Sequence, residues 1–197
     1  MVNSHITLER PEGRKMKAQT KKLISYLKLL GVTIDSDRFE DRIKAQKLAY
    51  IIQRRIGKIL YGDFSFYIRG PYSRELAREY FEYKKDFKEG KTEVGLTNEE
   101  NEEIDQTIPL LKSLNQRQLE IVASLLYLQD KGLDENKAEN KLNELKPHLK
   151  MEEIWMGSNI IKKLFLTEKL RAEIMSSLGE EREEWDRASN EGLRKFE

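Results

Sequence analysis

The sequence predicts a mainly α fold: a single compact multi-helix domain with a small two-stranded β element. Three observations lead to this prediction. Apolar residues recur three, four or seven positions apart along most of the chain, which is typical of helices that pack on one side. One short stretch, "DFSFYIRG", instead alternates and is rich in aromatic residues, as a strand does. No apolar run approaches the roughly 20 residues that span a bilayer.

The N-terminal half predicts an arm, two helices and two strands. Residues 1–14 are polar and interrupted by proline and glycine, so we expect a flexible arm. Helices are predicted over 15–30 and from about residue 35 to Gly57; the second has two apolar faces and should therefore be central. Short strands are expected near 63–69 and 91–96, pairing with each other, and Ser73 should cap the helix between them.

The C-terminal half predicts further helices. Thr97 and Glu100 form a capping box, Pro109 should kink or shorten the helix that follows, and Asn115 should cap the most apolar helix. Two more helices lie on either side of Pro147. We expect the helical domain to cover 15–178 and a charged helical extension to cover 179–197.

Composition narrows the classes of function. The 197 residues include 36 basic and 35 acidic side chains, a net charge of +1, so overall charge does not by itself indicate nucleic-acid binding. There is no cysteine, and the two histidines, His5 and His148, are far apart, so we expect no metal site and no cofactor. Abundant lysine and glutamate are typical of a thermophile's intracellular protein. With neither a membrane span nor a secretion signal in the sequence, we expect a cytoplasmic protein with no membrane partner.

No catalytic residues are predicted. The eleven glycines form no phosphate-binding loop, and neither a Gly-x-Ser-x-Gly elbow nor a cysteine nucleophile is present. The glutamates near residues 99–103 and 152–153 stand at the starts of predicted helices, where they favourably meet the positive end of the helix dipole. We therefore expect a protein that is not an enzyme.

A basic stripe on the second helix indicates one alternative function. At helical pitch its members fall within an arc of about 100°; they are Lys44, Lys47, Arg54, Arg55 and Lys58. Such a stripe could lie along phosphates of a nucleic acid. It could equally be the exposed side of a charge-rich helix.

The segment FSFYIRGPYSRELAREY, residues 64–80, is the other candidate site. Gly70, Pro71 and Ser73 predict a strand-to-helix corner whose helix would present free N–H groups near Ser73 as a seat for an anion. Four side chains around this corner are candidates for binding a partner: Tyr67, Arg69, Tyr72 and Arg74. A plain structural turn with packed aromatic rings is the alternative.

This segment, taken with "KLAYIIQRR" before it, resembles the core signature of the SocA-like or Panacea antitoxin domains and their YwgA-like archaeal and bacterial relatives. The matching positions are Lys47, Leu48, Tyr50, Phe66, Tyr67, Gly70, Pro71 and Tyr72. A second segment, "NELKPHLKMEEI" at 143–154, is similar to a Leu-Lys-Pro-His segment of the YwgA-like group. The resemblance implies a mainly α fold and a non-catalytic role, such as neutralising a toxin or adapting a partner.

The leading hypothesis is therefore a non-catalytic intracellular protein-interaction module, antitoxin-like or adaptor-like, that binds a toxin or a regulatory target through the Gly-Pro corner and neighbouring helices. The alternative is a DNA-binding transcriptional regulator that uses the basic stripe. The sequence leaves open whether the chain forms a homodimer.

Overall fold

The computed structural model describes residues 15–165 and residue 176. Within these residues the chain forms nine helices and one two-stranded antiparallel sheet, so the predicted mainly α fold with a small β element is confirmed. The predicted arm at 1–14 and the charged extension at 179–197 lie outside the described residues. The chain divides into two units, Met1–Ile161 and Lys162–Glu197, and the packing described below belongs to the first.

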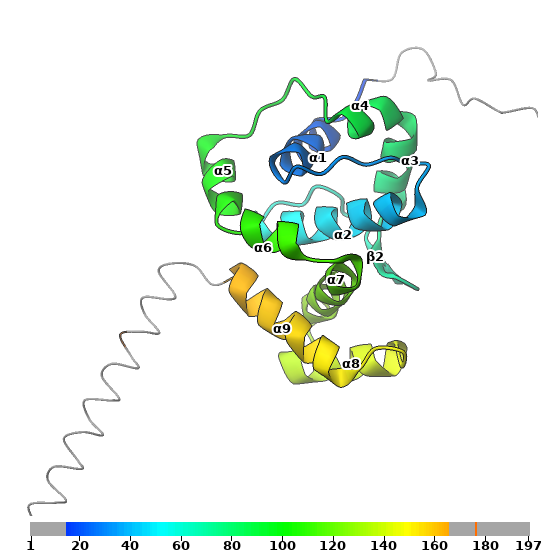
Figure 1. Ribbon diagram of the computed structural model, residues 1–197, viewed down its shortest axis with the longest axis vertical. Coiled ribbons are helices and arrows are strands. Elements are labelled where there is room, and N and C mark those ends of the chain that lie inside the picture. Colours follow the sequence, from blue (N-terminus) through cyan, green and yellow to red (C-terminus); the bar gives the residue numbers. More distant parts are fainter. Residues whose placement is uncertain (1–14, 166–175, 177–197) are drawn as a thin grey trace, which may run out of the picture. The chain divides into compact units, whose positions relative to one another are not determined.

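The elements follow one another with short connections (Figure 1). In chain order they are α1 (Ala18–Leu29), α2 (Phe39–Arg55), β1 (Ser65–Tyr67), β2 (Gly70–Tyr72), α3 (Arg74–Glu82), α4 (Lys84–Glu89), α5 (Asn98–Asp105), α6 (Ile108–Ser113), α7 (Gln116–Asp130), α8 (Glu135–Leu145) and α9 (Met151–Phe165). No helix of the described residues is long and apolar enough to cross a bilayer.

Helix α2 is the centre of the first unit, as its two apolar faces predicted. It contacts α1, α3, α5, α7 and strand β2, and Figure 1 shows it running between α1 and α4 on one side and α7 on the other. Its residues Leu48, Ala49, Ile51 and Ile52 are at most 1% exposed. Burial on both faces removes apolar surface of α2 from water, which stabilises the fold.

Helix boundaries follow local capping chemistry. Ser73, Thr97 and Asn115 each accept a hydrogen bond from a backbone N–H in the first turn of α3, α5 and α7, as predicted. Pro109 stands in the first turn of α6 and separates it from α5, so the predicted interruption is confirmed. Helix α2 begins at Phe39, four residues later than predicted from sequence.

The prediction of the second strand was wrong. Residues 91–96 contain no strand; β1 pairs with β2, so that Ser65 faces Tyr72 and Tyr67 faces Gly70. The physical reason is proximity, since a two-residue turn closes an antiparallel pair with little loss of chain entropy. The first strand is also shorter than the predicted 63–69.

The bend at this hairpin is therefore not the predicted Gly-Pro corner. Ile68 and Arg69 form the turn, while Gly70 and Pro71 are the first two residues of β2. Gly70 has a φ of +88°, and no residue other than glycine has a positive φ in the described part of the chain. This pattern is typical of an ordinary turn followed by one left-handed glycine.

Candidate functional site

Two consecutive side chains of α2 hold the hairpin in place. Gln46 donates to the carbonyl oxygen of Ser73 (3.0 Å) and accepts from its N–H (2.8 Å). Lys47 donates from Nζ to the carbonyl oxygen of Pro71 (2.7 Å). Strand β2, which pairs with β1, is therefore also tied to α2 through these side chains.

The predicted anion seat at the start of α3 is already filled. The carboxylate of Asp63 accepts hydrogen bonds from the hydroxyl of Ser73 and from the N–H of Glu75 (2.9 Å). Burial acts to raise the pKa of Asp63, but these hydrogen bonds outweigh it and lower the pKa below its usual value. Ser73 is itself buried, so this helix start has a structural role.

A cavity of about 330 Å³ opens between the first half of α2, α3 and the hairpin. We call it the hairpin groove, and it is lined by Phe39, Arg42, Ile43, Gln46, Lys47, Tyr67, Ile68, Arg69, Gly70, Tyr72, Tyr80 and Phe81. Three of the four predicted partner-binding residues are in this set. The fourth, Arg74, is exposed but does not line the groove.

Large apolar side chains are exposed around this groove. Ile68 is 78% exposed, Tyr67 62%, Phe81 54% and Phe39 52%. They come from α2, the hairpin and α3, and all four line the same cavity. Exposed apolar side chains scattered singly are ordinary, whereas a cluster around a hollow is typical of a binding surface.

Aromatic rings and Arg42 contact one another around the groove. The rings of Tyr67 and Tyr72, on the two strands of the hairpin, have centroids 5.9 Å apart. The guanidinium carbon of Arg42 lies 5.4 Å from the ring centroid of Phe39 and 5.9 Å from that of Phe81. Arg42 also donates to the carbonyl oxygens of Ser36 (2.8 Å) and Asp37 (3.2 Å), which fixes it at the rim.

The groove is lined by three basic residues and by no acidic residue. Lys47 is the buried member, at 2% exposed. Burial, with contributions from nearby Lys146 and Arg69 and against the opposing effect of Glu120, lowers the pKa of its ammonium group from 10.5 to about 7. Lys47 is thus a buried amine that is partly neutral near pH 7.

A buried ion pair lies behind the hairpin. Lys146 donates to one carboxylate oxygen of Glu120, with both side chains at most 6% exposed, and Arg69 lies 3.6 Å from the other oxygen. The ammonium of Lys146 also lies 5.8 Å from the ring centroid of Phe66. Two cations therefore share Glu120, which leaves it already paired rather than available to Lys47.

The basic stripe predicted on α2 is not one exposed surface. Lys47 is buried, which contradicts its place in the stripe, while Lys44 and Arg55 are half-buried. Arg54 pairs with Asp130 (2.5 Å) and Lys58 with Glu100 (3.2 Å). Helical pitch gives the direction of a side chain around its own axis but not what packs against it, so the sequence could not reveal these contacts.

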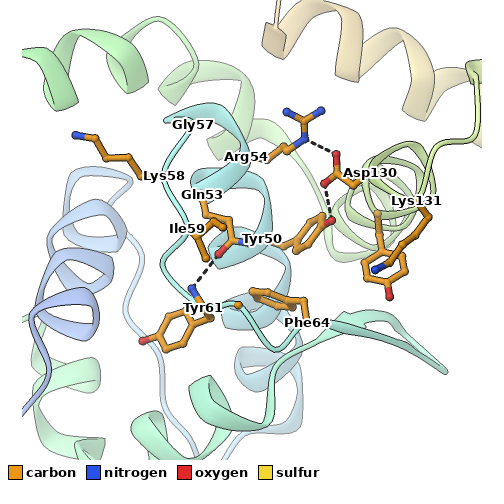
Figure 2. Close-up of a pocket in the computed structure, with 12 residues that line it drawn as sticks. Tyr50, Gln53, Arg54, Gly57, Lys58, Ile59, Tyr61, Phe64, Asp130 and Lys131 are labelled. Carbon is orange, nitrogen blue, oxygen red and sulfur yellow. Dashed lines mark hydrogen bonds and ion pairs between the residues drawn. The ribbon is translucent and has the colours of Figure 1, made fainter.

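A second cavity, of about 400 Å³, lies at the other end of α2. Figure 2 shows Tyr50 and Arg54 both directed at Asp130; the tyrosine hydroxyl donates to the carboxylate at 2.7 Å. Burial, and next the hydrogen bond to Asp130, raise the pKa of Tyr50. These polar groups satisfy one another, and Ile59 is the one large apolar side chain of this cavity that is strongly exposed, so the hairpin groove is the better candidate site.

Sequence reasoning found the hairpin side of the groove and missed the helical side. On the helical side the missed residues are Phe39, Arg42 and Phe81; Ile68, in the hairpin turn, was missed as well. One signal was present: Phe39 falls on a different face of α2 from the main apolar stripe, which indicates a second contact surface. No cluster of three or more His, Asp or Glu side chains suited to a metal occurs among the described residues.

Comparison of the chain with family models, with curated proteins and with solved structures found no significant match. The candidate function is therefore argued from the geometry of the groove.

Proposed function

We propose that this protein is a non-catalytic intracellular interaction module, antitoxin-like or adaptor-like, that binds a protein partner through the hairpin groove. One observation carries the proposal: four large apolar side chains, each more than half exposed, line a single cavity. The proposal is in keeping with what the resemblance to antitoxin domains implies.

The composition of the groove suits a protein partner. Aromatic residues and arginine contribute most of the binding energy at interfaces, and the groove has Phe39, Tyr67, Phe81 and two arginines. A partner side chain that enters the groove removes apolar surface of both proteins from water, at roughly 25 cal/mol per Å². The anchors are held by α2, α3 and a fixed hairpin, so little order has to be gained on binding.

The DNA-binding alternative has less support. It requires a row of unpaired cations on one face, whereas Arg54 and Lys58 have acidic partners and Lys47 is buried.

The test of the proposed function uses two isoleucines of almost equal exposure. Ile68, in the groove, is 78% exposed, and Ile59, outside it, is 80% exposed. Tagged wild type, Ile68→Asp and Ile59→Asp are used to capture partners from the native host, and bound proteins are quantified by mass spectrometry. We expect the partner recovered with wild type and with Ile59→Asp to fall at least about tenfold with Ile68→Asp, because a charge in the groove must be desolvated on binding.

Both isoleucines are at the surface, so both variants should melt within a few degrees of wild type. Equal recovery of the partner with Ile68→Asp and with wild type would show that the groove is not the interface.

A further inference from the structure

Lys47 has hydrogen-bonding capacity that the fold does not use. An ammonium group has three N–H donors, and among the described residues the acceptor for Nζ is the carbonyl oxygen of Pro71. No carboxylate of the described residues lies within ion-pair distance of it. The residue is 2% exposed and lines the hairpin groove, so any group that reaches it must enter through the groove. A buried charge without a counter-ion is unfavourable, and a ligand anion would relieve it.

The other two cations of the groove have partners already. Arg42 is held by two backbone carbonyl oxygens and two aromatic rings, and Arg69 lies beside Glu120. An anion that enters the groove would therefore gain most by pairing with Lys47. A single buried ammonium matches a single negative charge in a small apolar space. A phosphate, with nearly two charges and more acceptor oxygens, would remain poorly neutralised there.

We propose that the partner segment bound in the hairpin groove carries a carboxylate next to an aromatic or long aliphatic side chain, and that this carboxylate pairs with Lys47. The apolar side chain packs between Phe39, Ile68 and Phe81 while the carboxylate reaches the floor of the groove. This inference rests on the proposed function, and it adds the chemistry of the partner: an acidic peptide segment with an apolar anchor.

Binding of such a carboxylate is coupled to protonation of Lys47. The charged groups that face Lys47 are Lys146, which follows α8, Glu120 of α7 and Arg69 of the hairpin turn. In the free protein the ammonium form of Lys47 predominates only below pH 7, because burial lowers its pKa to about 7. The bound carboxylate favours the ammonium form and raises that pKa. Above pH 7 Lys47 must therefore take up a proton from the solvent when the carboxylate binds, so the affinity falls as the pH rises.

The experiment uses two small probes that differ in charge alone: N-acetyltryptophan, which has a carboxylate, and N-acetyltryptophanamide, which is neutral. Each is titrated into the full chain and followed by backbone amide NMR shifts. We expect both to shift residues of the groove, the acid binding at least about tenfold more tightly at pH 6. From pH 6 to pH 8 the affinity for the acid should fall by about tenfold, while that for the amide stays constant.

The matched variant is Lys47→Met, which removes the charge and keeps an unbranched apolar side chain. The substitution removes an unfavourable buried charge but also the donor to the carbonyl oxygen of Pro71, so a thermal melt checks that the variant remains folded. Lys47→Met should bind the two probes equally and without pH dependence. His148, which is exposed and lines a neighbouring cavity with Arg69, is still present in this variant. A pH dependence that is lost in Lys47→Met therefore does not come from His148.

The outcomes separate the two proposals. If both probes bind in the groove with equal affinity, or if the preference for the acid survives in Lys47→Met, the role of Lys47 is wrong and the groove remains a docking site. If neither probe shifts residues of the groove, both proposals are contradicted. If the acid instead drives association of two copies, seen as a rise in mass in solution, the occupant is the chain itself and not a separate partner.

Discussion

Gly70 lies close to α7. A Cβ atom at this position would lie 2.4 Å from the hydroxyl oxygen of Ser124, which is too close for any real contact. Its φ of +88° is also one that residues with a side chain rarely adopt. Space and backbone conformation together therefore explain glycine at 70, beside a Ser124 hydroxyl that is buried and has no hydrogen-bond partner among the described residues.

Gly70→Ala should destabilise the protein by about 3 kcal/mol, the sum of a left-handed backbone and a steric overlap. Gly57→Ala is the matched control, because Gly57 has a φ of +61° but a Cβ atom there would meet no other atom within 4 Å; it should cost about 1 kcal/mol. Chemical denaturation measures both.

Adding Ser124→Ala to Gly70→Ala removes the steric overlap and should bring the cost close to that of Gly57→Ala. If Ser124→Ala gives no such recovery, the approach of the hairpin to α7 is not what requires glycine.

Among the helices, the start of α5 joins three segments. Glu100 accepts from the N–H of Thr97 (3.1 Å) to complete the capping box, and it also pairs with Lys22 of α1 and with Lys58 just beyond α2. Burial opposes ionisation of this carboxyl group, but the hydrogen bonds from Lys22, Thr97 and Lys58 outweigh it and lower its pKa from 4.5 to about 2. The residue that caps α5 locally thus also joins α5 to α1 and to the end of α2.

Glu100→Gln should lower the free energy of unfolding at pH 7 by about 2 kcal/mol. Because the folded pKa is below the unfolded one, this contribution is present above pH 4.5 and is lost as the pH falls toward 2. The difference between wild type and variant should therefore shrink across that range in urea titrations at several pH values. Glu99→Gln, an exposed neighbour in the same turn, should change stability little at any pH. A difference that does not vary with pH would contradict the role of the charge.

The range of the contacts explains which elements were predictable. Helices with local caps, such as those at Ser73, Thr97 and Asn115, were predicted because the capping residues lie within four positions of the groups they satisfy. The pairing of β1 with β2 was missed because Gly-Pro indicates a bend wherever it occurs. In the structure this dipeptide pairs with β1, and its carbonyl also accepts from Lys47 on another element.

Across the protein, the charges are balanced, and cations of the predicted stripe have acidic partners on other elements. The net charge is +1, and Arg54 and Lys58 pair with Asp130 and Glu100. We therefore expect no saturable binding of duplex DNA in fluorescence anisotropy at about 50 mM salt, where phosphate contacts are strongest. Binding that falls steeply with salt and is abolished by Arg54→Glu with Lys58→Glu would contradict this expectation and favour the regulator hypothesis.

Patterns within short stretches of the chain were enough to predict the class of the fold, the central place of α2 and the importance of the hairpin segment, because each depends on periodicity, capping or composition. Tertiary packing was needed to place Phe39, Ile68 and Phe81 around one groove, to bury Lys47 beneath it, and to bring Asp63 to the start of α3. Burial and charge pairing are set by neighbours from distant parts of the chain, and no local pattern encodes those neighbours.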